Sequence, residues 1–380
     1  MSKKSLPRWS GYGLAAGDVG SGYGKSAAAA PPAGATQWGI GFEDGGAGYA
    51  AVPTGPWTAY YTGDPGENVD WQGLGYGKDG SGDPRWVFVW TRASSPGEIR
   101  YTSDLSAGAG GYTAVNLPPP DSGLACVAWS NDVWVAGGDT GTAHLWRSTD
   151  GAATWAEIDL SGLVPSIVSG PDIHGIATDG STNMMFAQRH SVYKSTDNGA
   201  TWSLSVDFDD PPYSLTGTYR MKKVVYVKDA DAWVVYYYKN GAKFRALANS
   251  DIADGTKWSI QFAGSTGGSV SSFPQIIAAG GETYVVGNGQ NAQRFTVADA
   301  APNPPVITSY AYVAPNLPHG NVRGVGTDGT GTWVCVHSGG DVSQSTDDGA
   351  TWTSAATGVA IPPGTDDDIK TVAADVYLPV

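Results

Sequence analysis

Short apolar runs recur along the chain, and each run ends in a turn signal. The runs mix β-branched, aromatic and glycine residues over a few positions, which indicates strands of a sheet rather than helices. Strand-like segments such as WVFVW (86–90) and TWVCV (332–336) follow the runs at a short distance. We therefore expect an all-β fold with little helix. The signals that end the runs stand at Asp79, Asp132, Asp179, Asp229, Gly281, Asp328 and Asp375.

A second repeat lies between these runs. The octets STDGAATW (148–155), STDNGATW (195–202) and STDDGATW (345–352) are copies of one motif, and weaker copies occupy 42–49, 102–112 and 249–258. Successive motif aspartates are 46 to 60 residues apart, which suits a four-stranded propeller blade. The aspartates of this series are Asp44, Asp104, Asp150, Asp197, Asp251, Asp299 and Asp347.

The two repeats are out of step at the ends of the chain, because no apolar run precedes the first octet position and no octet follows the last run. We therefore predict a seven-bladed β-propeller over residues 35–380. Its composite blade would take two strands from 36–52 and two from 369–380. This pairing would remove the open sheet edges at the seam of the ring.

The chemistry of the octet suits a hairpin. An aspartate can accept backbone N–H groups two residues ahead, glycine tolerates a positive φ, and the final tryptophan is large enough to pack over a blade interface. The residues that we assign to this structural role are Ser148, Asp150, Trp155, Ser195, Asp197, Gly199, Thr201, Trp202, Ser345, Asp347, Gly349, Thr351 and Trp352.

Octets 195–202 and 345–352 resemble the Asp-box of sialidase-like propellers, also called the bacterial neuraminidase repeat, at every position. Octet 148–155 departs from it, with Ala152 where glycine is expected. The resemblance implies a structural hairpin between the third and fourth strands of a blade, away from the central pocket. It does not imply catalysis, because the motif also occurs in non-enzymatic propellers.

Sialidases of that superfamily use three arginines, a tyrosine with a glutamate partner, and an aspartate as acid/base. Loops on the pocket side of the ring would carry Arg92, Arg189, Arg220 and Arg323. No acid/base partner stands out, the Arg-Ile-Pro type segment is absent, and sialidases resemble six-bladed rings. We therefore assign no catalytic residue, and keep a glycan-binding propeller or a glycoside hydrolase as the alternative.

Composition excludes several other classes. The net charge of −14, with only 22 Lys and Arg, argues against a nucleic-acid binder. Cys126 and Cys335 lie in apolar runs, which predicts buried free thiols. No secretory leader or membrane span is visible. Glycine-rich segments lack the Lys-Ser/Thr of a phosphate loop and acidic runs lack calcium-loop spacing, so we predict neither cofactor nor metal.

Residues 1–34 differ in chemistry from the rest. They hold four basic residues and one aspartate, so their net charge is +3. Because the whole chain has a net charge of −14, the remaining residues carry −17. The segment ends in AAAAPP (27–32), typical of a linker. We predict an extended N-terminal arm that docks on neighbouring subunits. Its expected anchors are Lys3, Lys4, Arg8, Trp9, Tyr12 and Tyr23.

A propeller with an arm and no recognisable active site suggests a non-enzymatic structural protein of a large symmetric assembly. We expect a bacteriophage virion protein of the tail, the adsorption apparatus or the capsid surface, assembled in the host cytoplasm and present in several copies. We also keep a host-surface glycan as a partner. A third interpretation is an assembly factor of the photosystem-associated Asp-box propellers, although no leader or lipid-attachment cysteine is visible.

Overall fold

The structure is a computed structural model of the 380-residue chain. It describes residues 37–42, 46–50, 58–61, 69–92, 98–107, 111–117, 123–138, 144–163, 173, 175–188, 190–208, 210, 219–239, 243–249, 251–265, 276–280, 283–288, 291–297, 307–313, 321–338, 340–356 and 369–374. The chain divides into two units, Met1–Pro31 and Pro32–Val380. All described residues belong to the second unit.

Four-stranded antiparallel sheets make up most of the described part of the chain, and two 3₁₀ turns that are fully described there are η1 (Leu105–Ala107) and η3 (Gly255–Lys257). In spatial order, one sheet consists of β28 (Ile369–Ala374), β1 (Trp38–Phe42), β2 (Gly46–Ala50) and β3 (Thr58–Tyr61). The next consist of β4 (Val69–Lys78), β5 (Pro84–Arg92), β6 (Glu98–Thr102) and β7 (Thr113–Asn116), and of β8 (Leu124–Ser130), β9 (Val133–Gly138), β10 (Leu145–Ser148) and β11 (Ala156–Ile158). Two more consist of β12 (Ile176–Thr178), β13 (Met184–Gln188), β14 (Ser191–Ser195) and β15 (Ser203–Asp207), and of β16 (Tyr219–Val227), β17 (Ala232–Lys239), β18 (Lys243–Asn249) and β19 (Ser259–Ser265). The last consist of β20 (Ile276–Gly280), β21 (Thr283–Asn288), β22 (Asn291–Val297) and β23 (Ile307–Val313), and of β24 (Val322–Thr327), β25 (Trp333–His337), β26 (Val342–Ser345) and β27 (Thr353–Ala356).

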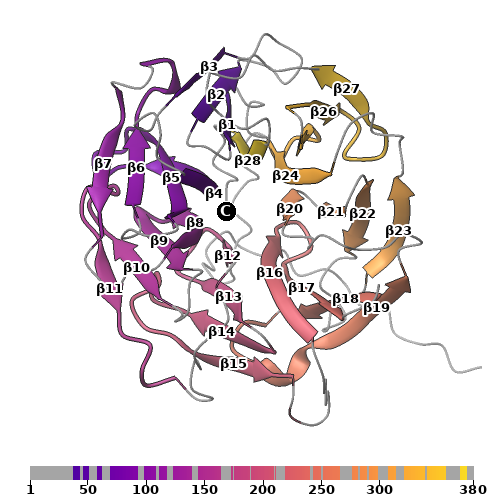
Figure 1. Ribbon diagram of the computed structural model, residues 1–380. Helices are drawn as coiled ribbons and strands as arrows, with labels where there is room; N and C mark the ends of the chain where they lie inside the picture. The colour runs from indigo at the N-terminus through magenta and orange to yellow at the C-terminus, as the bar shows by residue number, and fades with distance from the viewer. Residues whose placement is uncertain are drawn as a thin grey trace, which may run out of the picture. The chain divides into compact units, whose positions relative to one another are not determined.

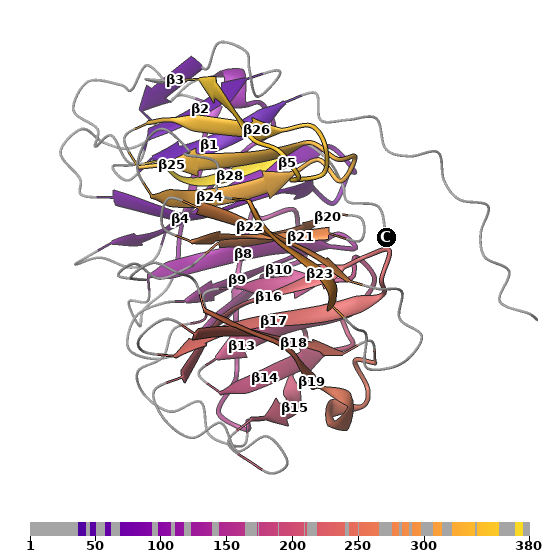
Figure 2. The same cartoon turned by 90° about the vertical axis from the view of Figure 1, so that its right-hand side faces the viewer.

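The sheets of the second unit stand around a common centre, as Figure 1 shows. Their first strands are β28, β4, β8, β12, β16, β20 and β24, and each of them contacts the next until β24 returns to β28. The apolar runs of the sequence form these inner strands. Figure 2 shows the same sheets from the side, as a stack of strands.

Turn chemistry explains why the inner strands end where they do. The Asp79 carboxylate accepts the backbone N–H groups of Ser81 and Asp83, at 2.8 and 3.0 Å. Asp328 does the same for Thr330 and Thr332, at 2.8 and 3.1 Å. A short carboxylate that satisfies the amides ahead of it favours a tight hairpin over continued strand. These two turns therefore deliver the chain directly from the first strand into the second strand of their sheets.

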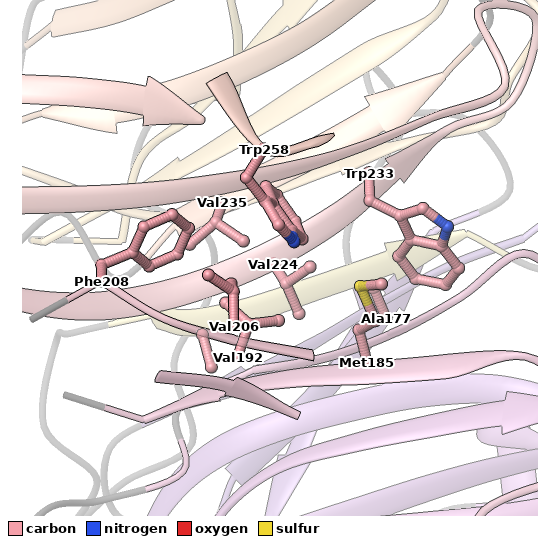
Figure 3. Packing of buried hydrophobic residues seen from close by; sticks show 10 residues of the cluster. Ala177, Met185, Val192, Val206, Phe208, Val224, Trp233, Val235 and Trp258 are labelled. Atoms are coloured by element: carbon pink, nitrogen blue, oxygen red, sulfur yellow. The ribbon is translucent and has the colours of Figure 1, made fainter. Parts of the chain in front are cut away.

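The core lies between neighbouring sheets rather than at one centre. Between the β12–β15 and β16–β19 sheets, Met185 and Val192 of one sheet belong to the same apolar cluster as Val224 and Val235 of the other, and Trp258 lies beside Val235 and Val224 (Figure 3). All these side chains are buried. These two sheets therefore bury apolar side chains against each other, and the large aromatic residues contribute much of the buried surface.

The composite sheet differs from our prediction in how it is divided. The C-terminal β28 pairs with β1, with Ile40 opposite Val372, so the two ends of the described chain share one sheet. However, within the described residues only one strand of this sheet, β28, comes from 369–380, and three come from the N-terminal side, the third being β3 beyond residue 52. The predicted division into two strands from each end is wrong, because the short connection after Phe42 joins the second and third strands rather than the third and fourth.

Candidate binding surfaces

The two full octets and the near match at 148–155 each close the turn between the third and fourth strands of a sheet with the same set of hydrogen bonds. In octet 195–202, the Ser195 hydroxyl donates to Asp197 at 2.7 Å and accepts the Gly199 N–H at 2.9 Å. Asp197 also accepts the Thr201 amide and hydroxyl, at 2.9 and 2.6 Å, and the indole N–H of Trp202 donates to the Gly199 carbonyl at 3.1 Å. Octets 148–155 and 345–352 repeat these bonds. The serine, aspartate, threonine and tryptophan of the motif thus act within their own turn.

These hydrogen bonds keep the octet aspartates ionised. Burial works against the charged form of Asp347, but the Thr351 hydroxyl and amide and the Ser345 hydroxyl outweigh it and hold its pKa at about 2. The pKa values of Asp150 and Asp197 are lowered in the same way. A general acid must carry a proton that it can donate, and these carboxylates are ionised. The octet aspartates therefore act as structural groups.

Two consecutive left-handed residues in each octet turn one carbonyl outward, toward the preceding sheet. Asn198 and Gly199 have φ values of 57° and 71°, and Asp348 and Gly349 have 59° and 78°. Octet 148–155 achieves the same bend with Gly151 at 72° and with Ala152 at 70°, so an alanine occupies the position where the motif has glycine.

An arginine of the preceding sheet binds that outward carbonyl in all three cases. The guanidinium of Arg85 donates to the Gly151 carbonyl at 2.6 Å, that of Arg147 to Asn198 at 2.9 Å, and that of Arg294 to Asp348 at 2.6 Å. Arg85 also pairs with Asp79, and Arg294 with the Asp348 carboxylate, both at 2.9 Å. We call these contacts the arginine ties. They fasten each octet to the sheet before it.

Of the weaker copies, two lie in described residues and are looser turns. Asp104 accepts the Ser106 amide at 2.7 Å and opens the 3₁₀ turn η1. Asp251 accepts the Ala253 amide at 2.9 Å, and the Lys194 ammonium of the preceding sheet donates to the Ala253 carbonyl at 2.8 Å. Asp44 and Asp299 lie outside the described residues. The stretch 42–49 cannot be an octet turn, because it joins the second and third strands of its sheet.

The arginines predicted for the pocket side are placed only in part. Arg92 ends β5, Arg220 lies near the beginning of β16, and Arg323 lies in β24, so their backbones stand at the side of the ring away from the octets. They belong to three sheets that are not neighbours in the ring. Arg189 lies outside the described residues, as do the arm residues.

A bulge recurs in four inner strands at this same side. The ladder between the first and second strands skips one residue near the beginning of the first strand. A bulge redirects a side chain and is often found beside binding sites. The sequence pattern alone did not reveal this feature. The extra residues are Gln72, Ala125, Lys222 and Arg323.

A groove of about 660 Å³ lies alongside β11, between that strand and octet 195–202 of the next sheet. The residues that line it include Trp155, Trp202, Arg147, Glu157 and Asp159. Glu157 is hydrogen-bonded to the His144 ring. The sequence analysis did not predict this groove. The available signal was that Trp155 and Trp202 end the octets of two successive repeats.

Both cysteines are free and buried, as predicted. The Cys126 thiol donates to the Ile173 carbonyl at 3.4 Å, and burial raises the pKa of Cys335 well above its usual value. Among the described residues, no group of acidic, histidine and cysteine side chains has the arrangement of a metal site. No helix in those residues is long and apolar enough to cross a membrane.

Comparison with known proteins identifies the architecture. No protein-family model and no curated protein sequence matches the chain. Solved structures do match. YCF48 from Cyanidioschyzon merolae is 16% identical with a TM-score of 0.53, over 78% of this chain and 89% of that one. YCF48 bound to D1 peptide is 12% identical with a TM-score of 0.50, over 78% and 87%.

The β-propeller domain of Cps50 (Swd1) from Myceliophteria thermophila is 8% identical with a TM-score of 0.52, over 80% of this chain and 90% of that one. At such identities the likeness concerns the fold alone. Antiparallel four-stranded sheets, inner strands in mutual contact and propeller neighbours agree with one another. The described part of this chain is a β-propeller.

Proposed function

We propose that this chain is a non-enzymatic structural protein of a large assembly, and that the assembly is a bacteriophage virion. In this proposal the ring is a seven-bladed propeller of the sialidase-like superfamily, its octets are Asp-boxes, and β28 closes it. Residues 1–34 form the arm that anchors it to neighbouring subunits in the tail, the adsorption apparatus or the capsid surface.

The observation that carries this proposal is the set of arginine ties. Arg85, Arg147 and Arg294 each join a sheet to the octet of the next sheet. A charge-assisted hydrogen bond of this kind contributes about 1.5–3 kcal/mol when sheltered from water. Repeated around a ring, such ties resist the opening of one blade from another, which is what a particle component under mechanical stress needs.

Two further points support the proposal. Residues 1–34 carry a net charge of +3, whereas the rest of the chain carries −17. Opposite charges on an arm and on ring surfaces favour association between copies or with similar acidic partners. Propeller structures of similar fold also hold protein ligands, as YCF48 does with D1 peptide.

The test is incorporation into native particles. The chain with residues 1–34 deleted should keep its cooperative melting transition but be absent from purified particles, as judged by electron microscopy and mass spectrometry. A full-length variant with Lys3, Lys4 and Arg8 changed to Gln is the matched control for charge, and should incorporate weakly. Normal incorporation of the deletion variant would refute the anchoring role.

The second candidate is a glycan-binding or glycan-hydrolysing propeller that uses the pocket side. The inner-strand bulges at Gln72 and Arg323 favour it, because bulges aim side chains at binding sites. Hydrolysis of a panel of sialosides and glucans, lost in Arg323→Gln, would support the enzyme and refute the structural proposal. Binding without turnover would support a receptor-binding role.

A further inference from the structure

We propose that the groove between β11 and octet 195–202 binds a neutral saccharide. This site lies beside the octets, not at the pocket side of the ring, and the inference does not rest on the proposed function. At about 660 Å³ the groove falls within the range of small-molecule sites, which is roughly 300–1,000 Å³.

The two indoles of the groove are held in fixed orientations. The Trp202 N–H donates to the Gly199 carbonyl at 3.1 Å, and its ring packs on Phe186 with centroids 4.8 Å apart. The Trp155 N–H donates to the Ala152 carbonyl at 3.0 Å. Because both N–H groups are used inside their own turns, the rings offer a ligand only carbon surface. The C–H face of a sugar ring matches that surface.

The tryptophan of octet 345–352 provides a contrast. Trp352 makes the same bond to its own turn, at 3.1 Å, yet its side chain is buried. Trp155 and Trp202 keep part of their surface exposed and line the groove. Trp155 and Trp202 are thus the octet tryptophans that line this groove.

The polar groups of the groove favour a ligand that donates hydrogen bonds. Glu157 and Asp159 line the groove; one Glu157 oxygen binds the His144 ring and one Asp159 oxygen accepts the Ser161 amide, which leaves the second oxygen of each carboxylate for a ligand. The Ser161 hydroxyl and amide lower the pKa of Asp159, so it stays ionised near neutral pH. The cation of the groove, Arg147, already uses its Nε for the Asn198 carbonyl. The groove thus has two carboxylates and one arginine whose Nε is already bonded. This balance disfavours an anionic ligand and favours sugar hydroxyls, which donate hydrogen bonds to carboxylates.

Small residues of the groove allow a flat ring to approach. Ala156 on β11 and Ala200 in octet 195–202 are exposed, and both line the groove. Replacing either with arginine would fill the space without removing a hydrogen bond of the octet. The chain also offers a matched control, because Ala350 occupies the same octet position as Ala200, is exposed, and lies in another sheet.

The experiment is calorimetric titration of the full chain with three neutral probes: cellohexaose, maltohexaose and hexa-N-acetylchitohexaose. We expect one of these probes to bind, and Ala200→Arg and Ala156→Arg each to weaken it at least about tenfold. Ala350→Arg should bind as the wild type does, and Glu157→Gln should bind more weakly. Thermal melting of each variant reports folding, and having two blocking variants on separate elements keeps the test valid if one of them unfolds.

Salt separates a neutral sugar from a cationic ligand. Saccharide binding should be unchanged as salt rises from about 0.05 to 0.5 M, because neutral ligands are not screened. Failure of all three probes to bind, or equal binding by wild type and both blocking variants, would refute the proposal. Binding of an oligolysine peptide alone, lost at high salt, would also refute it and identify a cationic peptide groove.

Discussion

Gly199→Ala and Gly349→Ala should destabilise the propeller by clearly different amounts, although both residues occupy the same octet position. Each glycine has a positive φ, which costs an alanine roughly 1–2 kcal/mol. Alanine recovers about 0.4–1 kcal/mol by restricting the unfolded chain. These two contributions are common to both sites, so the difference depends on the space beyond the glycine.

That space is set by the second strand of the preceding sheet. A Cβ at Gly199 would meet Val135 Cγ2 at 2.8 Å, whereas a Cβ at Gly349 would meet Val285 Cγ2 at 3.1 Å. Overpacking of a buried site costs about 1–3 kcal/mol, and the closer contact falls in the upper part of that range. We expect a loss of about 3 kcal/mol for Gly199→Ala and about 1 kcal/mol for Gly349→Ala.

Octet 148–155 supplies the reverse experiment. Ala152 is fully buried, so Ala152→Gly loses a methyl group worth about 0.8 kcal/mol and adds freedom to the unfolded chain, but it relieves a strained φ. These effects nearly cancel, and the variant should be close to wild type. Gly80→Ala is the control, because no atom lies within 4 Å of the added Cβ.

The assay is guanidinium chloride unfolding followed by tryptophan fluorescence, with equal m-values as the check that only stability has changed. Equal losses at Gly199 and Gly349 would show that φ alone governs the position. A larger loss at Gly349 than at Gly199 would contradict the packing of octets against the preceding sheet.

Four other outcomes follow from the octets and the seam. Folding lowers the pKa values of the octet carboxylates, to about 2 for Asp347, so their contribution to stability is present above about pH 4 and is lost as the pH falls toward 2. Asp347→Asn should therefore make the free energy of unfolding depend less on pH between about 4 and 2, and an unchanged pH dependence would contradict this reasoning. Ser195→Ala leaves the Gly199 amide without its 2.9 Å acceptor and should cost about 1–3 kcal/mol in denaturant unfolding, whereas Thr196→Ala, at the exposed neighbouring position, should cost little, and near-equal losses would count against the bond. Arg85→Met keeps the side-chain stem but removes the tie to Gly151, and should lower the free energy of unfolding by about 1–2 kcal/mol; no measurable loss would mean that the ties do not stabilise the ring. Removal of residues 369–380 takes β28 from β1 and exposes a strand edge, so size-exclusion chromatography and light scattering should show aggregation, and a monodisperse product with unchanged melting would refute closure by β28.

Much of the fold was predictable because its signals are local. The apolar runs that end at Asp79, Asp179 and Asp328 are the inner strands, and the octets do fall between third and fourth strands. Alternation of side chains and the hydrogen bonding of a turn depend on residues within a few positions of each other. Such patterns can be read directly from a chain.

The composite sheet shows where local reading fails. The weak motif around Asp44 predicted a turn between the third and fourth strands of the sheet. In the structure β28 is the first strand and β1 is the second, so the residues around Asp44 connect the second strand to the third. A pairing between the two ends of the chain, such as that of Ile40 with Val372, has no local signal, so the count of strands from each end was open until the sheet order was known.

The sequence by itself determined a repeated sheet-building unit, its turns, the burial of both cysteines and the separate chemistry of residues 1–34. Only the tertiary structure decided the division of the composite sheet, the arginine ties and the groove between Trp155 and Trp202. The physical reason is distance along the chain. Each tie joins residues 51 to 66 positions apart, and the partner that an arginine finds depends on which two sheets are packed together.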